Sequence, residues 1–335
     1  MSIKVIRAGM LTSIQDLGRY GMQKHGIIVS GAMDPFALRV GNLLVGNEER
    51  EAALEITMLG PTLQFLEDSL IAICGGNLSP KIDGHKIPGW RPILVKKGSI
   101  LEFGAARSGC RAYLTLAGGF DIPQVMGSRS TYLRAGLGGF QGRALKKGDI
   151  LNLRAPSELA NKMKDSLSKT TGVQLFSTSK WSVSNRLLSF YQKKTIIRVL
   201  PGNQFYRFTW DSRKKFFTRD FFITQQSDRM GYQLKGPQTR LSEPLELVSE
   251  AVSTGTVQIP PAGNPIILMA DRQTTGGYPK IAQIINVDIP ILAQIKPGEK
   301  IRFQMVTLEE SQELYRTREV EIRKLKLAIA SKVQR

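Results

Sequence analysis

Short apolar segments separated by turn residues recur through the first 155 residues of the chain. They lie at residues 3–6, 26–29, 53–57, 62–65, 70–74, 93–95, 100–103, 112–117 and 150–153. Segments of this length, bounded by Gly, Pro and Asn, are typical of the strands of a β-sandwich or barrel. The 32 Gly and 16 Pro residues of the chain suit a fold with many turns. We therefore expect a mainly β domain at residues 1–155.

One helix is expected inside this first domain, at residues 35–44. Asp34 is a suitable N-cap, and Pro35 fits the first helical position, where a backbone N–H is not needed. The apolar face of this helix would carry Phe36, Val40, Leu43 and Leu44. We expect the helix to lie across the end of a barrel.

The composition changes after residue 155. Residues 156–195 are rich in Lys and Ser and show weak hydrophobic periodicity, which predicts a basic, partly mobile linker or insertion. The strand pattern resumes at residues 196–305 and predicts a second β domain. In residues 306–335, Thr307 and Glu310 form the pattern of a capping box. An amphipathic C-terminal helix is expected there, and it would pack on a domain or on a partner through Ile322, Leu325 and Ile329.

The two β regions resemble each other weakly and in the same order. Residues 3–9 parallel 197–202, 18–21 parallel 228–231, 54–56 parallel 245–247, and 97–103 parallel 297–303. We infer two pseudo-repeated β-barrel domains with a few helices. A cleft between related halves is a natural place for a ligand.

The charge of the chain attracts anions without indicating nucleic acid. There are 47 Lys and Arg residues against 28 Asp and Glu, a net charge of +19, but the excess is spread along the chain. Only 7% of residues are aromatic and no nucleic-acid motif is present, so we expect no nucleic-acid partner.

No apolar run approaches the length of a membrane span, and the two cysteines, Cys74 and Cys110, fit a reducing compartment. We expect a cytoplasmic protein without a membrane partner.

The sequence lacks the residues that several kinds of catalytic site require. His25 and His85 are the only histidines, which argues against a histidine-rich metal site or a Ser-His-Asp relay, and we expect both at turns or on the surface. Residues 136–142 are rich in glycine but do not match a nucleotide-binding fingerprint, and a tight turn is the simpler interpretation. No metal ligands are predicted.

The segment Asp271-Arg-Gln-Thr-Thr-Gly-Gly-Tyr-Pro279 concentrates more hydrogen-bonding groups than a turn requires. It follows an apolar strand and combines an acid, a guanidinium, an amide, two hydroxyls and two glycine amides. Such a bend can hold a carboxylate or a phosphate while Asp271 accepts a proton. The alternative is a polar hairpin whose Thr and Asp side chains satisfy its own turn.

A second cluster combines Gln15-Asp-Leu-Gly-Arg-Tyr-Gly21 with Val29-Ser-Gly-Ala-Met-Asp34. Ser30 and Gly31 precede the expected helix N-terminus, a position that favours anions, and Asp34 is more simply a cap than a catalytic acid. Arg19 and Arg229 occupy equivalent places in the two halves. They either clamp an anion or pair with Asp16 and Asp228 beside them.

These motifs resemble the biotin-dependent carboxyltransferase or allophanate hydrolase subunit 2 family. The resemblance lies in Gln15-Asp-Leu-Gly-Arg-Tyr-Gly21, Ser30-Gly-Ala-Met-Asp34, Asn42-Leu-Leu-Val-Gly-Asn47, Leu54-Glu-Ile-Thr57, Gly60-Pro61, Ser227-Asp-Arg-Met-Gly-Tyr232 and Asp271-Arg-Gln-Thr-Thr-Gly-Gly-Tyr-Pro279. Residues 156–195 and the terminal helix carry none of it.

The resemblance implies two cyclophilin-like β barrels and a subunit of an ATP-dependent 5-oxoprolinase complex. Such a complex opens 5-oxoproline to L-glutamate and contains two further proteins, a KipI-like B subunit, which would be the direct partner, and the A subunit. ATP, with or without Mg²⁺, acts at the level of the complex, and no biotin is attached to this chain. The resemblance also implies that the chain binds and antagonises a KipI-like inhibitor of a sporulation histidine kinase. A purely regulatory binding protein is an alternative.

A second alternative is carboxyl transfer from biotin, as in urea carboxylase or urea amidolyase. Only half of a biotin-acceptor Met-Lys-Met motif is found, at Met163-Lys164-Asp165, and no biotin carboxylase region accompanies it. For lactam opening, the hypothesis assigns catalytic roles to Asp271, Gln273 and Thr274. It assigns substrate or anion binding to Arg19, Ser30, Gly31, Arg229, Tyr232, Thr275, Gly276 and Gly277.

Overall fold

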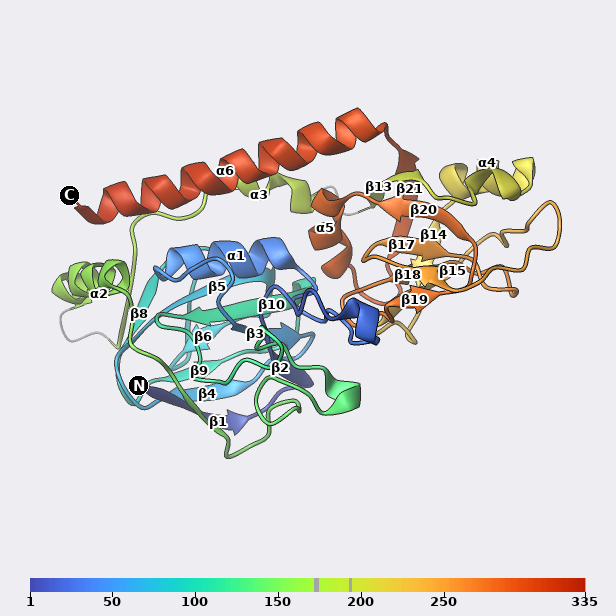
Figure 1. Ribbon diagram of the computed structural model, residues 1–335. Helices are drawn as coiled ribbons and strands as arrows, with labels where there is room; N and C mark the ends of the chain where they lie inside the picture. The colour runs from blue at the N-terminus through green and yellow to red at the C-terminus, as the bar shows by residue number, and fades with distance from the viewer. Residues whose placement is uncertain (172–174, 193–194, 335) are drawn as a thin grey trace. The chain divides into compact units, whose positions relative to one another are not determined.

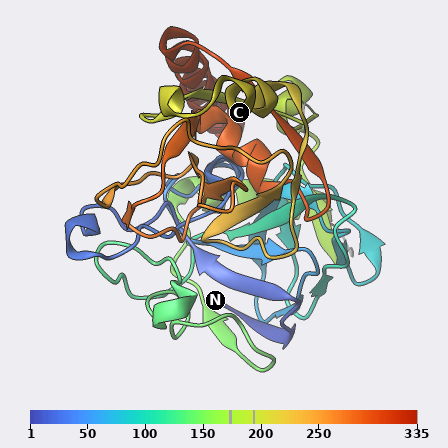
Figure 2. The same ribbon diagram turned by 90° about the vertical axis from the view of Figure 1, so that its right-hand side faces the viewer.

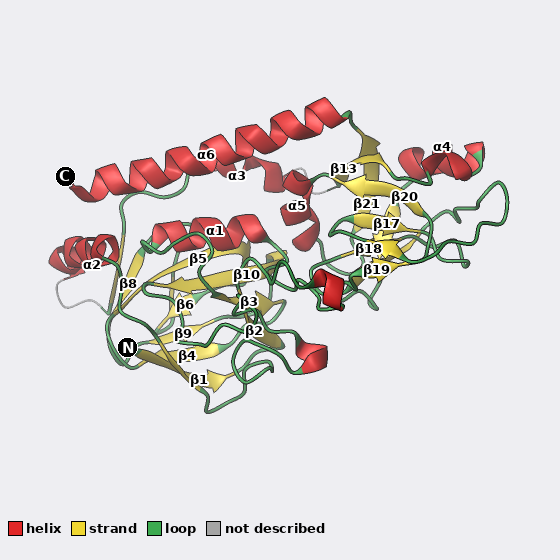
Figure 3. Ribbon diagram, viewed as in Figure 1, coloured by secondary structure: helices red, strands yellow, loops and turns green. Residues whose placement is uncertain are grey.

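The computed structural model describes residues 1–171, 175–192 and 195–334 and divides the chain into two compact units. Unit 1 contains residues 1–19, 34–188 and 321–335, and unit 2 contains residues 20–33 and 189–320. Strands and loops dominate both units, as Figure 3 shows. The expected mainly β fold with barrel-like domains and a C-terminal helix is confirmed.

Unit 1 is built from two six-stranded antiparallel sheets (Figure 1). The first has the order β11 (Ile150–Asn152), β1 (Ser2–Arg7), β4 (Thr62–Phe65), β9 (Ile100–Glu102), β6 (Lys81–Ile82) and β7 (His85–Lys86). The second has the order β12 (Phe176–Thr178), β8 (Ile93–Val95), β5 (Ser69–Asn77), β10 (Ser108–Leu116), β3 (Ala53–Thr57) and β2 (Leu11–Gln15). The core lies between them, because alternate residues of both sheets, such as Ile3, Phe65, Ile56 and Leu114, are fully buried in one cluster.

Helix α1 (Pro35–Leu44) has the predicted bounds and the predicted cap. The Ala37 amide donates to Asp34 Oδ1 at 2.9 Å. The helix does not lie across the end of a barrel as expected, because it packs on β5 and β10 and so buries the second face of these strands. Gly41 permits this approach, since a Cβ there would lie 2.9 Å from Thr115 Cγ2.

The segment expected to be a linker carries regular structure. Helix α2 (Glu158–Thr171) buries Ala160 and Met163, and β12 pairs with β8 inside unit 1. A short helix, α3 (Asn185–Leu188), follows. Lys162, Ser166, Ser168 and Lys169 of α2 are exposed, so a basic composition did not prevent one apolar face of the helix from packing. Residues 172–174 and 193–194 of that expected linker lie outside the described residues.

Unit 2 is centred on a closed seven-stranded barrel, seen after a 90° turn in Figure 2. Its order is β13 (Ile196–Pro201), β20 (Lys280–Ile284), β17 (Thr256–Gln258), β18 (Ile266–Leu268), β15 (Gly231–Lys235), β14 (Phe221–Ile223) and β21 (Lys300–Met305). Strands β13 and β21 run parallel and close the barrel. A separate hairpin pairs β16 (Glu250–Ala251) with β19 (Thr275–Gly276). Helices α4 (Trp210–Thr218) and α5 (Ile289–Ala293) also belong to this unit. The ring of Phe216 in α4 stacks on the ring of Phe303 in β21, with the two ring centroids 4.3 Å apart.

Single helical turns η1 to η5 interrupt the loops of both units. They are η1 (Gln23–His25), η2 (Leu133–Ala135), η3 (Ser189–Gln192), η4 (Phe205–Arg207) and η5 (Asn286–Asp288).

The C-terminal helix α6 (Leu308–Gln334) begins at the predicted capping box. Thr307 Oγ1 accepts from the Glu310 amide at 3.1 Å, and Glu310 Oε2 accepts from the Thr307 amide at 2.8 Å. Ile322 and Ile329 are each 2% exposed, so the predicted apolar face is packed. Within the described residues, no helix combines the length and the apolar composition needed to span a membrane.

Candidate functional site

Ser30, Arg229 and Asp271 form one hydrogen-bonded network inside unit 2. Arg229 binds the Asp271 carboxylate through two N–H groups, Nε to Oδ2 at 2.9 Å and Nη2 to Oδ1 at 3.0 Å. The Ser30 hydroxyl donates to Asp271 Oδ1 at 2.7 Å, and Arg229 Nη2 also donates to the Gly31 carbonyl at 2.6 Å. The three side chains are buried. Residues that are 241 positions apart in the chain are therefore joined directly.

The backbone of the barrel sets this geometry. Strands β15 and β18 are antiparallel neighbours, with Gly231 opposite Leu268. Beyond the strand ends, the Met269 amide donates to the Met230 carbonyl at 2.9 Å and the Asp271 amide to the Arg229 carbonyl at 2.8 Å. This continued pairing places the Arg229 and Asp271 side chains next to each other, where a guanidinium and a carboxylate fit in bidentate fashion.

Ser30 and Gly31 belong to a chain segment, residues 20–33, that is part of unit 2. Met33 in this segment is buried in the core of the barrel unit. Ser30 has φ +56° and Gly31 has φ +94°, so two consecutive residues adopt left-handed backbone. That conformation is unfavourable for serine, and such residues concentrate at functional positions.

The network limits what Asp271 can do. Both carboxylate oxygens accept hydrogen bonds, from a guanidinium and a hydroxyl, and the group is 6% exposed. The geometry therefore suits a positioning role in which Asp271 fixes Ser30 and the start of the following hairpin.

The hairpin after Asp271 presents the more accessible groups. Gln273 and Thr275 are exposed, whereas Thr274, Gly276 and Gly277 are half-buried. The Val252 amide donates to the Thr274 carbonyl at 3.1 Å, and Thr275 and Gly276 pair with Ala251 and Glu250. A Cβ on Gly276 would lie 2.5 Å from Gln258 Nε2, so a larger residue there would displace the Gln258 side chain.

The neighbourhood of the hairpin includes residues that sequence reasoning missed. Lys280, 8% exposed, donates to Glu250 Oε2 at 2.7 Å and thereby ties the hairpin to strand β20. Gln258 Nε2 donates to the Tyr278 carbonyl at 3.5 Å. Arg272 donates to Thr254 Oγ1 at 2.7 Å, and burial lowers the pKa of its guanidinium below the usual value. Lys280 was recognisable only as a charged residue inside an apolar strand.

Tyr232 lies in strand β15 and is 2% exposed. It is packed in the hydrophobic core of unit 2. Its predicted role in binding substrate stays a prediction, and the structure describes it as a core residue.

Arg19 belongs to unit 1, whereas Ser30, Arg229 and Asp271 belong to unit 2. It is fully buried and donates to the carbonyls of Val125 at 3.0 Å and Ser130 at 2.9 Å. Neighbouring Asp16 accepts from the hydroxyls of Ser128 (2.7 Å) and Ser130 (2.5 Å). Arg19 therefore binds acceptors of unit 1, and Arg229 binds Asp271 and the Gly31 carbonyl of unit 2. The anion clamp formed by the two arginines stays a prediction.

A buried polar cluster in unit 1 was also missed. The Tyr113 hydroxyl donates to Glu55 Oε2 at 2.6 Å and accepts from the Asp34 amide at 2.8 Å. Burial, with the nearby Glu55 and Asp34 charges, raises the pKa of Tyr113 well above its usual value. Burial and the Asp34 charge likewise raise the pKa of the Cys74 thiol. This cluster anchors the start of α1 to strands β3 and β10, which agrees with a capping role for Asp34.

Other sequence features have simple structural accounts. His25 and His85 are exposed, as expected. Residues 136–142 form a compact turn in which a Cβ on Gly142 would lie 1.9 Å from the Gly136 carbonyl oxygen. Among the residues described, no group of three or more His, Cys, Asp or Glu is placed to hold a metal ion.

A protein-family model described as the carboxyltransferase domain, subdomain A and B, matches residues 25–305. The chain belongs to this carboxyltransferase A/B family. The resemblance noted from the sequence motifs is confirmed, and the match includes Ser30, Arg229 and the complete 271–279 hairpin.

Two curated members of the carboxyltransferase A/B family are similar over most of their length. The C subunit of 5-oxoprolinase from Escherichia coli is 41% identical over 310 residues, which cover 92% of this chain and 93% of the relative. The C subunit of 5-oxoprolinase from Haemophilus influenzae is 36% identical over 330 residues, covering 98% and 99%. The crystal structure of the Kluyveromyces lactis urea carboxylase is similar with a TM-score of 0.82 and 28% identity. It covers 97% of this chain, which spans only 29% of that larger protein.

Proposed function

We propose that this chain is a subunit of an ATP-dependent 5-oxoprolinase complex that opens 5-oxoproline to L-glutamate. The observation that carries the proposal is the 36–41% identity to two relatives, each named as the C subunit of 5-oxoprolinase, over nearly their whole length. In the complex, the direct partner would be a KipI-like B subunit, with a separate A subunit, and the complex would act in the cytoplasm.

The chemistry of lactam opening agrees with the groups on the hairpin. A lactam is stabilised by resonance, and transfer of the γ-phosphoryl group of ATP to its carbonyl oxygen, with release of ADP, would leave an electrophilic carbon that water attacks. Cleavage of the C–N bond, with the proton going to the amine, would open the ring, and hydrolysis of the resulting acyl phosphate would give glutamate and phosphate. Such a reaction needs oriented donors for the anionic oxygens more than it needs a strong nucleophile. Gln273 and Thr275 offer exposed side chains, and Gly276 and Gly277 offer close backbone approach.

The roles within the proposed site follow from exposure. Gln273 and Thr275 would contact 5-oxoproline or the transferred phosphoryl group, and Thr274 would support them from its half-buried position. Asp271 and Arg229 would hold the hairpin and Ser30 in place through their bidentate contact. ATP, with or without Mg²⁺, would act in the assembled complex, and biotin would not be attached to this chain.

The decisive experiment is reconstitution from purified components. The chain is mixed with its two partner proteins, and consumption of 5-oxoproline and ATP is followed while each component is omitted in turn. We expect turnover to require this chain. Unchanged turnover without it would overturn the proposal.

Variants of this chain, measured in the same assay, test which residues form the site. Gln273→Ala and Thr275→Val each remove one exposed donor, and we expect kcat/KM for 5-oxoproline to fall roughly tenfold or more. Gln312→Ala is the matched control, because Gln312 is an exposed glutamine on α6 of the same unit, away from the hairpin in sequence. Equal effects of Gln273→Ala and Gln312→Ala would contradict the assignment.

Carboxyl transfer is a second candidate, favoured by the structural similarity to urea carboxylase at TM-score 0.82. It predicts that a carboxylated biotin carrier, supplied with urea or a related amide, loses its carboxyl group in the presence of this chain. The lactam reaction predicts no such loss.

In a regulatory role, the chain would bind a KipI-like inhibitor and thereby release a sporulation histidine kinase from inhibition. This role uses the same contact with the KipI-like partner. It is tested by measuring the activity of the inhibited kinase with and without the chain.

A further inference from the structure

Four strands of the first sheet of unit 1 place polar side chains in one row on its solvent face. Arg7 of β1 is opposite Thr62 of β4, Thr62 is opposite Glu102 of β9, and Glu102 is opposite Lys81 of β6. Leu63, Leu101 and Ile82, which neighbour Thr62, Glu102 and Lys81 in their strands, are fully buried. Because side chains alternate across a strand, these three polar side chains face away from the core. Arg7 is exposed as well, although Val5 two residues earlier is buried, because the pairing of β1 with β4 is irregular between them.

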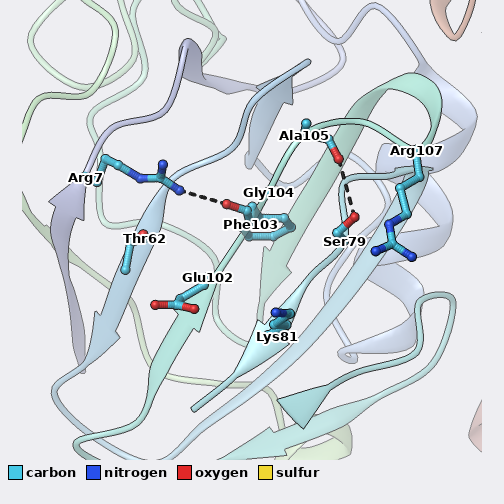
Figure 4. Close-up of a pocket in the computed structure, with 9 residues that line it drawn as sticks. All are labelled: Arg7, Thr62, Ser79, Lys81, Glu102, Phe103, Gly104, Ala105 and Arg107. Carbon is cyan, nitrogen blue, oxygen red and sulfur yellow. Dashed lines mark hydrogen bonds between the residues drawn. The ribbon is translucent and has the colours of Figure 1, made fainter. Parts of the chain in front are cut away.

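A pocket of about 680 Å³ lies over this row, as Figure 4 shows. The loop at residues 103–107 and the turn at Ser79 form its other walls. The turn and the loop are linked, since the Ser79 hydroxyl donates to the Ala105 carbonyl at 3.4 Å. Arg107 extends from this loop at the side of the pocket opposite Arg7.

Arg7 is positioned by the fold. The pairing of β1 with β4 has an irregularity between Val5 and Arg7. Such bulges redirect a side chain and are common beside functional sites. Arg7 Nη2 donates to the carbonyls of Phe103 (2.9 Å) and Gly60 (3.4 Å). These acceptors are neutral, so they orient the guanidinium without cancelling its charge.

The pocket carries an excess of positive charge. Three cations, Arg7, Lys81 and Arg107, line it with a single carboxylate, Glu102, so the net charge of the lining is +2. Among the described residues, none of these four groups has an ion-pair partner within 4.0 Å. Other arginines of unit 1 do have such partners, for example Arg143 with Asp149 at 2.7 Å. Thr62 and Ser79 add hydroxyl groups to the lining.

We propose that this pocket binds a small molecule that carries two or more anionic oxygen groups, either phosphates or carboxylates. Guanidinium groups bind both kinds of oxyanion with paired N–H donors, and lysine adds a point charge. The pocket is open to solvent, and its charged and hydroxyl groups can bind a hydrated ligand. The pocket lies entirely within unit 1, and the proposal does not depend on the lactam-opening function.

Calorimetric titration of the full chain tests the proposal with pyrophosphate and, in a separate arm, citrate at equal ionic strength. We expect at least one of them to bind with one-to-one stoichiometry, and the two arms distinguish phosphate from carboxylate ligands. Arg107→Ala and Lys81→Met should each weaken binding roughly tenfold, since each removes one charged donor. Glu102→Gln should strengthen it, because the one repulsive charge is removed.

Lys147→Ala is the matched control, since Lys147 is an exposed lysine of the same unit outside the pocket. It removes one positive charge and should leave binding within twofold of the parent. A thermal melt of each variant confirms that it is folded. Binding of neither anion, or equal losses in Lys147→Ala and Arg107→Ala, would overturn the proposal, and so would weaker binding in Glu102→Gln.

Discussion

Replacing Arg229 with alanine probes how strongly the Ser30–Arg229–Asp271 network holds unit 2 together. The substitution removes both N–H groups that bind the Asp271 carboxylate and the one that binds the Gly31 carbonyl. Asp271 is 6% exposed, so water cannot fully replace the guanidinium. Breaking a buried ion pair from one side costs about 3–5 kcal/mol, and we expect a loss near the middle of that range.

The same unit offers a matched pair. Arg198 binds Asp288 in bidentate fashion, at 2.5 and 3.0 Å, and Asp288 is fully buried. The Arg198 side chain is 26% exposed, and its backbone amide also donates to Asp288 Oδ2 at 2.7 Å. Arg198→Ala therefore leaves Asp288 with one donor and access to water, and we expect a smaller loss of about 1–2 kcal/mol.

A double-mutant cycle separates the pair from its surroundings. Arg229→Met with Asp271→Leu removes both charges, and replacing a buried pair by apolar groups is often nearly neutral. We expect the double variant to lose less free energy of unfolding than Arg229→Met and Asp271→Leu lose together, with a coupling free energy of roughly 2–3 kcal/mol.

Unfolding must be followed in unit 2 itself, because a chain of two compact units need not unfold in one step. Hydrogen exchange of amides in β15, β17 and β18 reports the opening free energy of the barrel. Additive single effects, within about 0.5 kcal/mol, would refute the argument that the pair acts as one unit. So would a larger loss in Arg198→Ala than in Arg229→Ala.

Three further predictions concern local structure. Asp34→Ala should lower the free energy of unfolding of unit 1 by about 1–2 kcal/mol while Asp34→Asn costs less, as measured by urea unfolding, because asparagine still accepts from the Ala37 amide. Thr307→Ala should raise hydrogen exchange in the first turn of α6 by roughly fivefold, reflecting about 1 kcal/mol of lost capping, without changing exchange in β1. Hydrogen bonds from Arg143 lower the pKa of Asp149, so the stability they add is present above pH about 4 and is lost as the pH falls through that lowered pKa. The melting temperature of Asp149→Asn should therefore lie below that of the parent at pH 7 and converge with it in acid, and a constant gap would contradict this account.

The parts of the fold that local signals determine were predictable. Helix α1 has its predicted bounds because Asp34, Pro35 and the apolar spacing act within one short segment. Strands β3, β4 and β8 also match the apolar runs at 53–57, 62–65 and 93–95. In the weak internal repeat, β1 corresponds to β13 and β9 corresponds to β21. Residues 245–247, however, form no strand, whereas their predicted counterpart, residues 54–56, lies in β3.

The errors arose where tertiary packing decides the outcome. Residues 26–29 form no strand, because this apolar segment belongs to an irregular stretch that packs with unit 2. Strand β2 was missed, since its polar Thr12, Ser13 and Gln15 are buried and hide the usual alternation. In the site, the sequence suggested donors at Ser30, Arg229 and Asp271 but not their partners. Their pairing depends on β15 and β18 lying side by side, which is a long-range property.

Ser30 shows how a site can retain a locally unfavourable residue. Its φ of +56° costs a non-glycine residue about 1 kcal/mol, whereas its hydrogen bond to the Asp271 carboxylate contributes roughly 1.5–3 kcal/mol. Ser30→Gly removes both effects, and Ser30→Ala removes only the hydrogen bond. We therefore expect Ser30→Ala to be the less stable variant by about 1 kcal/mol, measured by hydrogen exchange in unit 2. If Ser30→Gly is instead more stable than the parent, the hydroxyl does not offset the backbone strain, and its retention must be explained by contact with a ligand.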